Sequence, residues 1–257
     1  MIQVVKIGGH VLEDPAQLEA FCRDFAALEG PKVLVHGGGE MAGRIQHSLG
    51  IEPVCIEGRR VTDEATLQVV TMVYAGWCNK HLVARLQALG CDALGLAGCD
   101  AGVITARRRP PKTLSDGHTV VDYGWVGDVT PASVHAGRLR RFLGAGLTPV
   151  LCAINHDGAG RLLNTNADTV AASVATALQA SLTYCFEKDG VLDAAGNVIP
   201  ELTPKDYAAL KVDGAVSGGM VPKLENAFAA LDAGAAHVII TSASDISKSG
   251  GTTLKPA

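Results

Sequence analysis

The chain has 257 residues, of which 47% are hydrophobic and thirty are glycine, and its formal net charge is −4. This length suits one large α/β domain or two lobes that share a sheet. The slightly acidic balance does not indicate a polyanionic partner, so we expect no nucleic acid to bind. No apolar stretch is long enough to span a bilayer, so we expect no membrane partner either.

Seven cysteines are scattered singly through the chain, and no two of them form a C-x-x-C pair. An odd, dispersed set argues against a disulfide framework or a zinc site and favours a reducing compartment. The N-terminal run I-Q-V-V-K-I is too short for a signal peptide. We therefore expect a cytoplasmic protein.

Short apolar runs alternate with helical patterns along most of the chain. Strands are predicted at residues 2 to 7, 33 to 35, 92 to 96, 148 to 154, 182 to 186 and 237 to 241. Helices are predicted from Pro15 after an N-cap at Asp14, and at 40 to 49, 63 to 89, 168 to 179 and 220 to 233. Short apolar strands joined by helices predict an α/β fold, a three-layer αβα sandwich with a mostly parallel central sheet.

The stretch 104 to 128 interrupts this alternation and predicts hairpins at the rim of the fold. Arg107, Arg108 and Arg109 lie in it, directly before two prolines. We interpret this basic run as a solvated loop or hairpin edge. We expect a single domain over residues 1–257, with a weak division into lobes at 1–178 and 179–257.

Ligands of open α/β sheets bind at the carboxyl ends of the strands, and two glycine clusters fall there. One is Lys6-Ile7-Gly8-Gly9, and the other is His36-Gly37-Gly38-Gly39. Glycines let backbone N–H groups approach a phosphate, and a lysine or a helix N-terminus adds positive charge. Neither cluster is a Walker A or a G-x-G-x-x-G motif. Each of them alone also fits a simple tight turn.

Two further clusters lie where later helices begin. In L-N-T-N-A-D at 163 to 168, Asn166 or Asp168 could serve only as a helix cap. In S-G-G-M-V-P-K at 217 to 223, Lys223 falls in the first turns of a helix. A cation is unfavourable there unless an anion is close, which favours a bound phosphate.

Together, in this order and spacing, the clusters resemble the amino-acid kinase family, and most closely its N-acetylglutamate kinases. The resemblance covers nearly the whole chain. It includes K-I-G-G, V-H-G-G-G, G-R-R-V-T at 58 to 62, N-K-H-L-V at 79 to 83, V-G-D-V at 126 to 129, L-N-T-N-A-D-T-V-A-A at 163 to 172, G-G-M-V-P-K and the closing G-G-T-T-L.

The resemblance implies a role for each matched residue. Lys6 and Lys223 match the lysines that clamp the transferring phosphate, and Asp168 matches the aspartate that holds both lysines. The residues that match the acyl-glutamate site are Gly38, Gly39, Arg60 and Asn164. In that match, Arg60 forms a bidentate ion pair with a carboxylate of the substrate. The residues that match phosphate or nucleotide contacts are Gly8, Gly9, Glu187, Gly190, Gly219 and Met220.

The activity that the resemblance implies is transfer of the γ-phosphoryl group of ATP to the side-chain carboxylate of N-acetylglutamate, in arginine biosynthesis. Mg²⁺ would arrive with ATP and be held mainly by the phosphates, without a dedicated protein site. The first lobe would bind the acyl-glutamate and the second would bind ATP. We also expect a homodimer, with the helix at 63 to 89 near the interface. Because the first strand begins at Ile2, we expect no helix ahead of it and no feedback by arginine.

Two segments depart from the family pattern. Trp77 and Cys78 stand where a lysine and a valine are common. Cys185-Phe186-Glu187-Lys188 stands where a serine or threonine, an aspartate and a valine usually contact the nucleotide side.

Three alternatives remain at this point. One is N-succinylglutamate as the acceptor, which would need an added cation for its second carboxylate. The others are a different kinase of the same fold, such as a carbamate, aspartate or uridylate kinase, and a non-catalytic ligand-binding relative.

Overall fold

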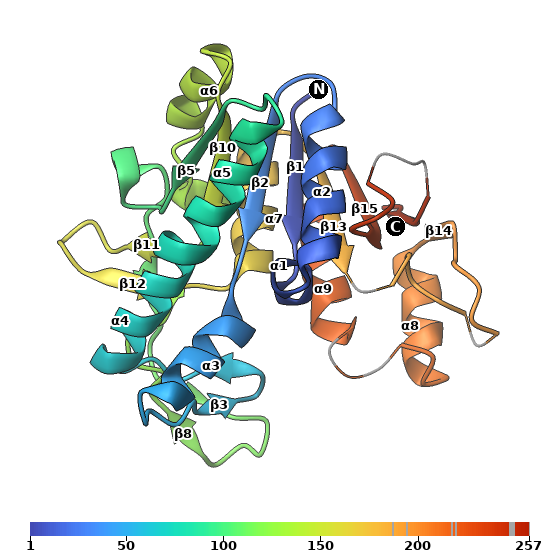
Figure 1. The fold of residues 1–257 in the computed structure, drawn as a ribbon. Helices are drawn as coiled ribbons and strands as arrows, with labels where there is room; N and C mark the ends of the chain where they lie inside the picture. Colours follow the sequence, from blue (N-terminus) through green and yellow to red (C-terminus); the bar gives the residue numbers. More distant parts are fainter. Residues whose placement is uncertain (187, 194, 217, 219, 247–249, 257) are drawn as a thin grey trace.

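The computed structural model describes residues 1–256 except 187, 194, 217, 219 and 247–249. An eight-stranded sheet forms its centre (Figure 1). In spatial order its strands are β14 (Glu201–Leu202), β16 (Thr252–Leu254), β15 (His237–Ser242), β13 (Ser181–Phe186), β1 (Gln3–Ile7), β2 (Lys32–His36), β10 (Thr148–Cys152) and β5 (Ala93–Leu96). Neighbours from β15 to β5 are parallel, and β16 is antiparallel to β15. The predicted mostly parallel sheet is confirmed.

Strand β1 lies between β13 and β2, with Lys6 opposite Tyr184 on one side and Val35 on the other. The chain continues from β1 to β2 on one side, and returns to β13 on the other side much later. Such a change of direction opens a crevice at the carboxyl ends of the strands, where ligands of α/β sheets bind. Strands from before residue 178 build one half of the sheet, and strands from 181 onward build the other.

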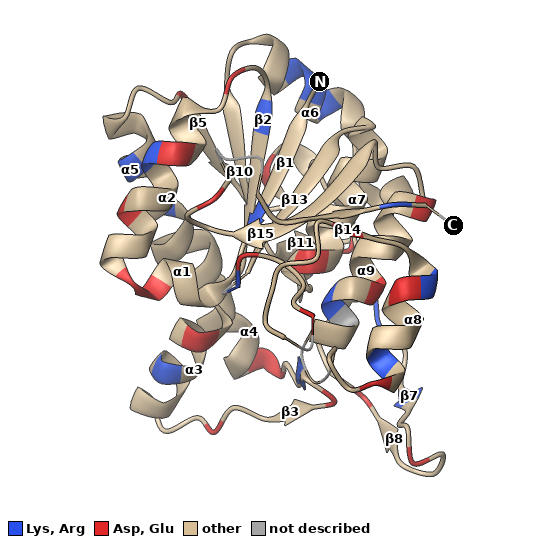
Figure 2. Cartoon of the chain, turned by 90° about the vertical axis from the view of Figure 1, so that its right-hand side faces the viewer, with Lys and Arg blue, Asp and Glu red and all other residues tan. Residues whose placement is uncertain are grey.

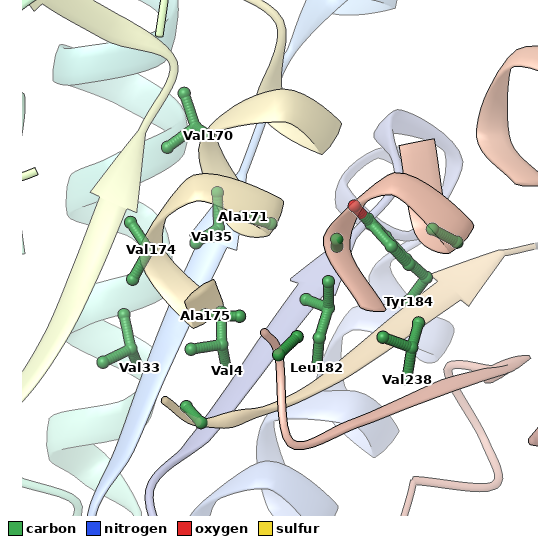
Figure 3. Packing of buried hydrophobic residues seen from close by; sticks show 14 of the residues in the cluster. Val4, Val33, Val35, Val170, Ala171, Val174, Ala175, Leu182, Tyr184 and Val238 are labelled. Atoms are coloured by element: carbon green, nitrogen blue, oxygen red, sulfur yellow. The ribbon is translucent and has the colours of Figure 1, made fainter. Parts of the chain in front are cut away.

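Helices cover both faces of the sheet because successive strand residues point to opposite sides. Val4 contributes to the apolar cluster on one face, and Val5 contributes to the cluster on the other. On the Val4 face lie α6 (Ala136–Gly144), α7 (Ala167–Leu178), α8 (Pro204–Val212) and α9 (Met220–Asp232). On the Val5 face lie α1 (Gly9–Glu13), α2 (Pro15–Ala27), α3 (Gly39–Ser48), α4 (Glu64–Thr71) and α5 (Asn79–Ala88). Figure 3 shows Val174 and Ala175 of α7 beside the strand residues Val33 and Val4.

The helix predicted at 63 to 89 is present, but it is not one regular α-helix. Residues Met72–Cys78, between α4 and α5, form a π-helical segment, η1. A π-helical turn rotates the side chains that follow it, and such turns often occur at functional sites. Here the segment carries Tyr74 and Cys78, which both pack against Gly38. The sequence did not predict α1, α6 or α8.

The rim hairpins predicted at 104 to 128 are present. Strand β6 (Arg107–Arg108) pairs with β9 (Gly127–Asp128), and β7 (Lys112–Thr113) pairs with β8 (Val120–Val121). Arg107 and Arg108 are exposed. The solvated interpretation is wrong for Arg109, whose side chain is only 13% exposed and forms an ion pair with Asp128. Its guanidinium also lies over the ring of Tyr123.

Two further short pairs of strands complete the described fold. They are β3 (Cys55–Ile56) with β4 (Arg59–Arg60) and β11 (Ile154–His156) with β12 (Leu162–Asn164). The 3₁₀ turns are η2 (Asp100–Gly102) and η3 (Pro131–Ser133). None of the described helices has the length and apolar character that crossing a membrane requires.

Charged residues lie mostly on helices and loops, while the strands of the central sheet are largely uncharged (Figure 2). Lys6 and Lys32 are two buried lysines on these strands. The Nζ of Lys32 donates to the carbonyls of Ala26 and Leu28, at 2.7 and 2.6 Å, and so closes the end of α2. Lys6 has a side-chain carboxylate as its partner instead, at the edge of a cavity.

Candidate active site

A cavity of about 480 Å³ opens at the carboxyl ends of β1 and β2. Predicted site residues that line it are Lys6, Gly9, Gly38, Gly39, Arg60, Asn164 and Asp168. They come from four separate parts of the sequence, and the fold brings them to one cavity.

Lys6 and Asp168 form an ion pair at this cavity. The Nζ of Lys6 lies 2.6 Å from Oδ1 of Asp168, and the two side chains are 9% and 15% exposed. The cap of α7 is Asn166, whose side-chain oxygen accepts from the Thr169 N–H at 3.0 Å. The capping interpretation therefore holds for Asn166, and the carboxylate of Asp168 is directed to Lys6. The hydroxyl of Tyr184 fixes the same turn by donating to the Asp168 carbonyl at 2.9 Å.

The second glycine cluster ends β2 and begins α3. Gly38 has φ of +150°, a conformation that L side chains rarely adopt. A Cβ at this residue would lie 2.9 Å from Cδ1 of Tyr74 and 3.1 Å from Sγ of Cys78. Only glycine fits here, and its N–H lies beside the N-terminus of α3, where anions are favoured.

His36 precedes these glycines and is fully buried. Its Nε2 lies 3.0 Å from Nδ2 of Asn79, an amide nitrogen that can only donate, so Nε2 accepts and Nδ1 carries the proton. Nδ1 lies 2.9 Å from the Gly37 carbonyl. Burial lowers the pKa of His36 to about 4, with a smaller contribution from the nearby charge of Lys80. The imidazole is thus neutral at pH 7. Its hydrogen bond with Asn79 joins the V-H-G-G-G segment to the N-K-H-L-V segment.

Arg60 also lines the cavity. One terminal nitrogen donates to the Gly39 carbonyl at 2.8 Å, and the other donates to Oε1 of Gln46. Gln46 is itself buried and donates to Thr66. Each terminal nitrogen of a guanidinium carries two hydrogens, so Arg60 retains donors for a ligand carboxylate.

Asn164 lies at the end of β12 and is 8% exposed. Its Nδ2 donates to Oγ1 of Thr62 at 3.0 Å, which fixes the orientation of the amide. Asn164 and Arg60 thus line the same cavity as Gly38 and Gly39, the other two residues predicted for the acyl-glutamate site.

Arg59 and Tyr74 are among the lining residues that the sequence did not single out. Arg59 precedes Arg60 in G-R-R-V-T, and its pKa is lowered by burial and by the charge of Arg109. Tyr74 comes from the π-helical segment, and burial raises its pKa. The adjacent arginine was a usable signal for Arg59, whereas no sequence pattern indicated that Tyr74 turns inward.

Four of the remaining predicted residues, Gly8, Gly190, Met220 and Lys223, are not among those that line the cavity. Gly8 is the N-cap of α1. Lys223 lies on α9 with its Nζ 4.2 Å from the centre of the Phe186 ring. Met220 packs against the apolar cluster on that face, and Gly190 packs against Val198 and Thr252. Glu187 and Gly219 fall outside the described residues.

Within the described part of the chain, no three His, Cys, Asp or Glu side chains converge as a metal-binding group. Asp168 is already paired with Lys6. Among the described residues, the carboxylates that line the cavity are those of Asp168 and Glu40, too few to enclose a Mg²⁺ ion without phosphate or water ligands.

The amino acid kinase family model matches residues 1–242 of this chain. An acetylglutamate kinase of Phocaeicola vulgatus is 47% identical over 261 residues, covering 99% of this chain and 98% of the relative. Among solved structures, an N-acetylglutamate synthase from Neisseria gonorrhoeae in complex with coenzyme A and N-acetyl-glutamate has a TM-score of 0.82 at 25% identity. The alignment covers 98% of this chain but only 59% of the synthase.

Carbamate kinase from Giardia lamblia, bound to AMP-PNP, has a TM-score of 0.69 at 15% identity, with 100% of this chain and 98% of that one covered. At this identity the likeness concerns the fold alone. The family model covers most of the chain, and the acetylglutamate kinase aligns with nearly all of it. This chain belongs to the amino acid kinase family.

Proposed function

We propose that this protein transfers the γ-phosphoryl group of ATP to the side-chain carboxylate of N-acetylglutamate, forming N-acetylglutamyl 5-phosphate and ADP in arginine biosynthesis. The observation that carries the proposal is one cavity in which the Lys6–Asp168 pair lies together with Arg60 and Asn164. Lys6 supplies a cation for the reacting carboxylate, and the guanidinium of Arg60 can donate two hydrogen bonds to a second carboxylate. The cavity therefore suits an acylated glutamate, which has two carboxylates.

Binding of the acceptor follows from the residues that line the cavity. Arg60 would pair with the α-carboxylate, and the amide of Asn164 would orient the rest of the molecule. Gln46 and the Gly39 carbonyl already hold the guanidinium. Little side-chain freedom is therefore lost on binding, which favours affinity. The reacting carboxylate would then point toward Lys6 and the N–H groups at Gly9 and Gly38.

Phosphoryl transfer depends on positioning and on stabilising charge on the transferring group. Lys6 and the glycine N–H groups would contact that group from the acceptor side, and Lys223 would contact it from the nucleotide side. Asp168 holds Lys6 and need not act as a base, because a carboxylate acceptor is already ionised at neutral pH. Mg²⁺ bound to the ATP phosphates would neutralise part of their charge. We place ATP in the second lobe, 179–257, and the acceptor in the first, 1–178.

Among the alternatives, another kinase of this fold is less well supported, because the carbamate kinase shares 15% of its residues against 47% for the acetylglutamate kinase. N-Succinylglutamate differs from N-acetylglutamate by a second acyl carboxylate, and Arg59 is the cavity residue that would have to pair with it. The relatives are named acetylglutamate kinases, which favours N-acetylglutamate over N-succinylglutamate as the acceptor.

A coupled assay of ADP release, with N-acetyl- and N-succinylglutamate side by side, tests the proposal. We expect turnover with a higher kcat/KM for the acetyl compound. A preference of at least tenfold for the succinyl compound would overturn the acetyl assignment. Ligand binding without ADP release would instead support the non-catalytic alternative.

The assembly that we propose is a homodimer formed through α4, η1 and α5. Met72 and Trp77, both in η1, are 59% and 61% exposed, and exposed large apolar side chains are common at protein interfaces. We also propose a cytoplasmic location, since all seven cysteines are free thiols, as is usual in a reducing compartment.

A further inference from the structure

Phe186 is the last residue of β13, in the C-F-E-K segment that departs from the family pattern, and it is 5% exposed. Lys6 lies opposite Tyr184 in the register of β1 and β13. Because side chains alternate along a strand, Phe186 shares the face of Tyr184, two residues further toward the carboxyl end. The two rings stack with centroids 5.6 Å apart and planes 12° apart.

Both proposed phosphate lysines lie over this ring. The Nζ of Lys223 is 4.2 Å from the centre of Phe186, and the Nζ of Lys6 is 5.8 Å from it. An ammonium group within about 6 Å of a ring centre, over its face, is attracted by the negative potential of that face. The lysines arrive from different elements, α9 and β1, so the ring is their common contact.

Tyr184, whose ring stacks on Phe186, contacts Asp168. The Tyr184 hydroxyl donates to the carbonyl of Asp168, whose carboxylate pairs with Lys6. The aromatic pair thus supports Asp168 and Lys6 from the same face that holds Lys223.

We propose that Phe186 is a positioning residue that holds Lys223, and more weakly Lys6, toward the transferred phosphoryl group. The inference rests on the proposed kinase function. A carboxylate in the same place would orient Lys223 but would also neutralise it and repel the phosphates. The uncharged ring orients the ammonium and leaves its full charge for the transition state. Because the ring is buried, it also limits the water that competes for the lysine.

The competing explanation is that Phe186 only fills space under α9. The two explanations differ in whether the electron density of the ring matters. Fluorine atoms withdraw that density while changing the size of the ring little. Site-specific incorporation of 4-fluoro-, 3,5-difluoro- and 3,4,5-trifluorophenylalanine at residue 186 therefore weakens the attraction in steps and preserves the packing.

We expect kcat/KM for N-acetylglutamate to fall at each step, by roughly tenfold over the series, with most of the loss in kcat. The matched control is the same series at Phe25, a fully buried ring with the Nζ of Lys32 at 5.4 Å from its centre and no place in the cavity. Its kinetics should stay at the wild-type value. A flat series at residue 186, or equal losses at both positions, would overturn the proposal.

A second measurement does not depend on activity. In protein with ¹³C-labelled lysine, the ε-CH₂ signal of Lys223, assigned as the one missing from Lys223→Arg, should be shifted upfield by the ring. Phe186→Leu should return it to the position of an exposed lysine, and an unshifted wild-type signal would refute the contact. If the wild-type protein shows the shift but phosphorylates no acyl-glutamate, the proposed function fails and the ring contact stands.

Discussion

The ammonium of Lys6 and the carboxylate of Asp168 lie 2.6 Å apart although they come from β1 and α7, more than 160 residues apart in sequence. The pair is mostly buried, so each partner fixes the other at the edge of the cavity. Lys6→Ala and Lys223→Ala should each lower kcat by roughly 10²-fold, the scale of losing one preorganised charge.

The control for this prediction is Lys205→Ala, which removes an exposed lysine on α8 and should leave kcat unchanged. Circular dichroism should show that the two site variants stay folded. A near-normal kcat in either variant would remove that lysine from the proposed clamp. Asp168→Asn keeps the shape but not the charge, and should reduce kcat by releasing Lys6.

Arg60→Lys should raise KM for N-acetylglutamate by roughly tenfold while KM for ATP changes by less than about twofold. A lysine cannot reproduce the fork that Gln46 and the Gly39 carbonyl hold in place. Arg108→Lys, on an exposed rim strand where the arginine pairs with Asp122, is the control and should change neither KM. Equal increases for the two substrates would place Arg60 outside the acceptor site.

Gly38→Ala should destabilise the protein and reduce activity together. A Cβ would meet the Tyr74 ring at 2.9 Å, and the φ of +150° is strained for alanine. We expect a loss on the order of 2–3 kcal/mol, which lowers Tm by roughly 5 °C or more. Gly30 also has a positive φ, but its Cβ would have nothing within 4 Å, so Gly30→Ala measures strain without the clash. Equal Tm losses in the two variants would argue against the contact with Tyr74.

The sequence predicted the elements whose side chains have a clear apolar face. Asp14 caps α2 as predicted, accepting from the N–H groups of Ala16 and Gln17, and the predicted inward face of that helix is buried. Helix α8 was missed because none of its residues is buried, so no periodic apolar face exists to detect. Helix α6 has one buried residue, Leu139, among several arginines.

The site was predictable where glycines and charges stand together in a motif, as at Lys6 or Asp168. Tyr74 was not, because its inward position depends on a π-helical turn inside a regular apolar pattern. Phe186 was noted only as a departure from the family. Its relation to Lys223 depends on the packing of α9 against the sheet, and local sequence does not encode that contact.

The exposed apolar residues of η1 give a prediction about assembly. Trp77→Asp should convert the proposed dimer to a monomer in sedimentation equilibrium, because a charge would be buried without a partner at the interface. Val212→Asp is the matched control: Val212 is 87% exposed on α8, away from the proposed interface, and its variant should stay dimeric. A monomeric wild-type protein would contradict the proposed assembly.

His36 gives a prediction about stability and pH. Its pKa is lowered from 6.5 to about 4 in the folded state, mainly by burial. The unfolded chain therefore binds a proton at pH values where the folded chain does not. The free energy of unfolding should therefore fall as the pH decreases from about 6.5 to about 4. Below about pH 4, His36 should cause no further loss of stability.

At pH 5.0 the loss attributable to His36 should be on the order of 2 kcal/mol relative to pH 7.5. Urea unfolding at the two pH values measures it. His36→Asn is less stable at pH 7.5, because it loses the contact with Asn79, but its stability should change less between the two pH values. His118→Asn removes an exposed histidine and should keep the wild-type change. If His36→Asn and the wild type lost equal stability on acidification, His36 would not be the buried neutral group that supports the glycine loop.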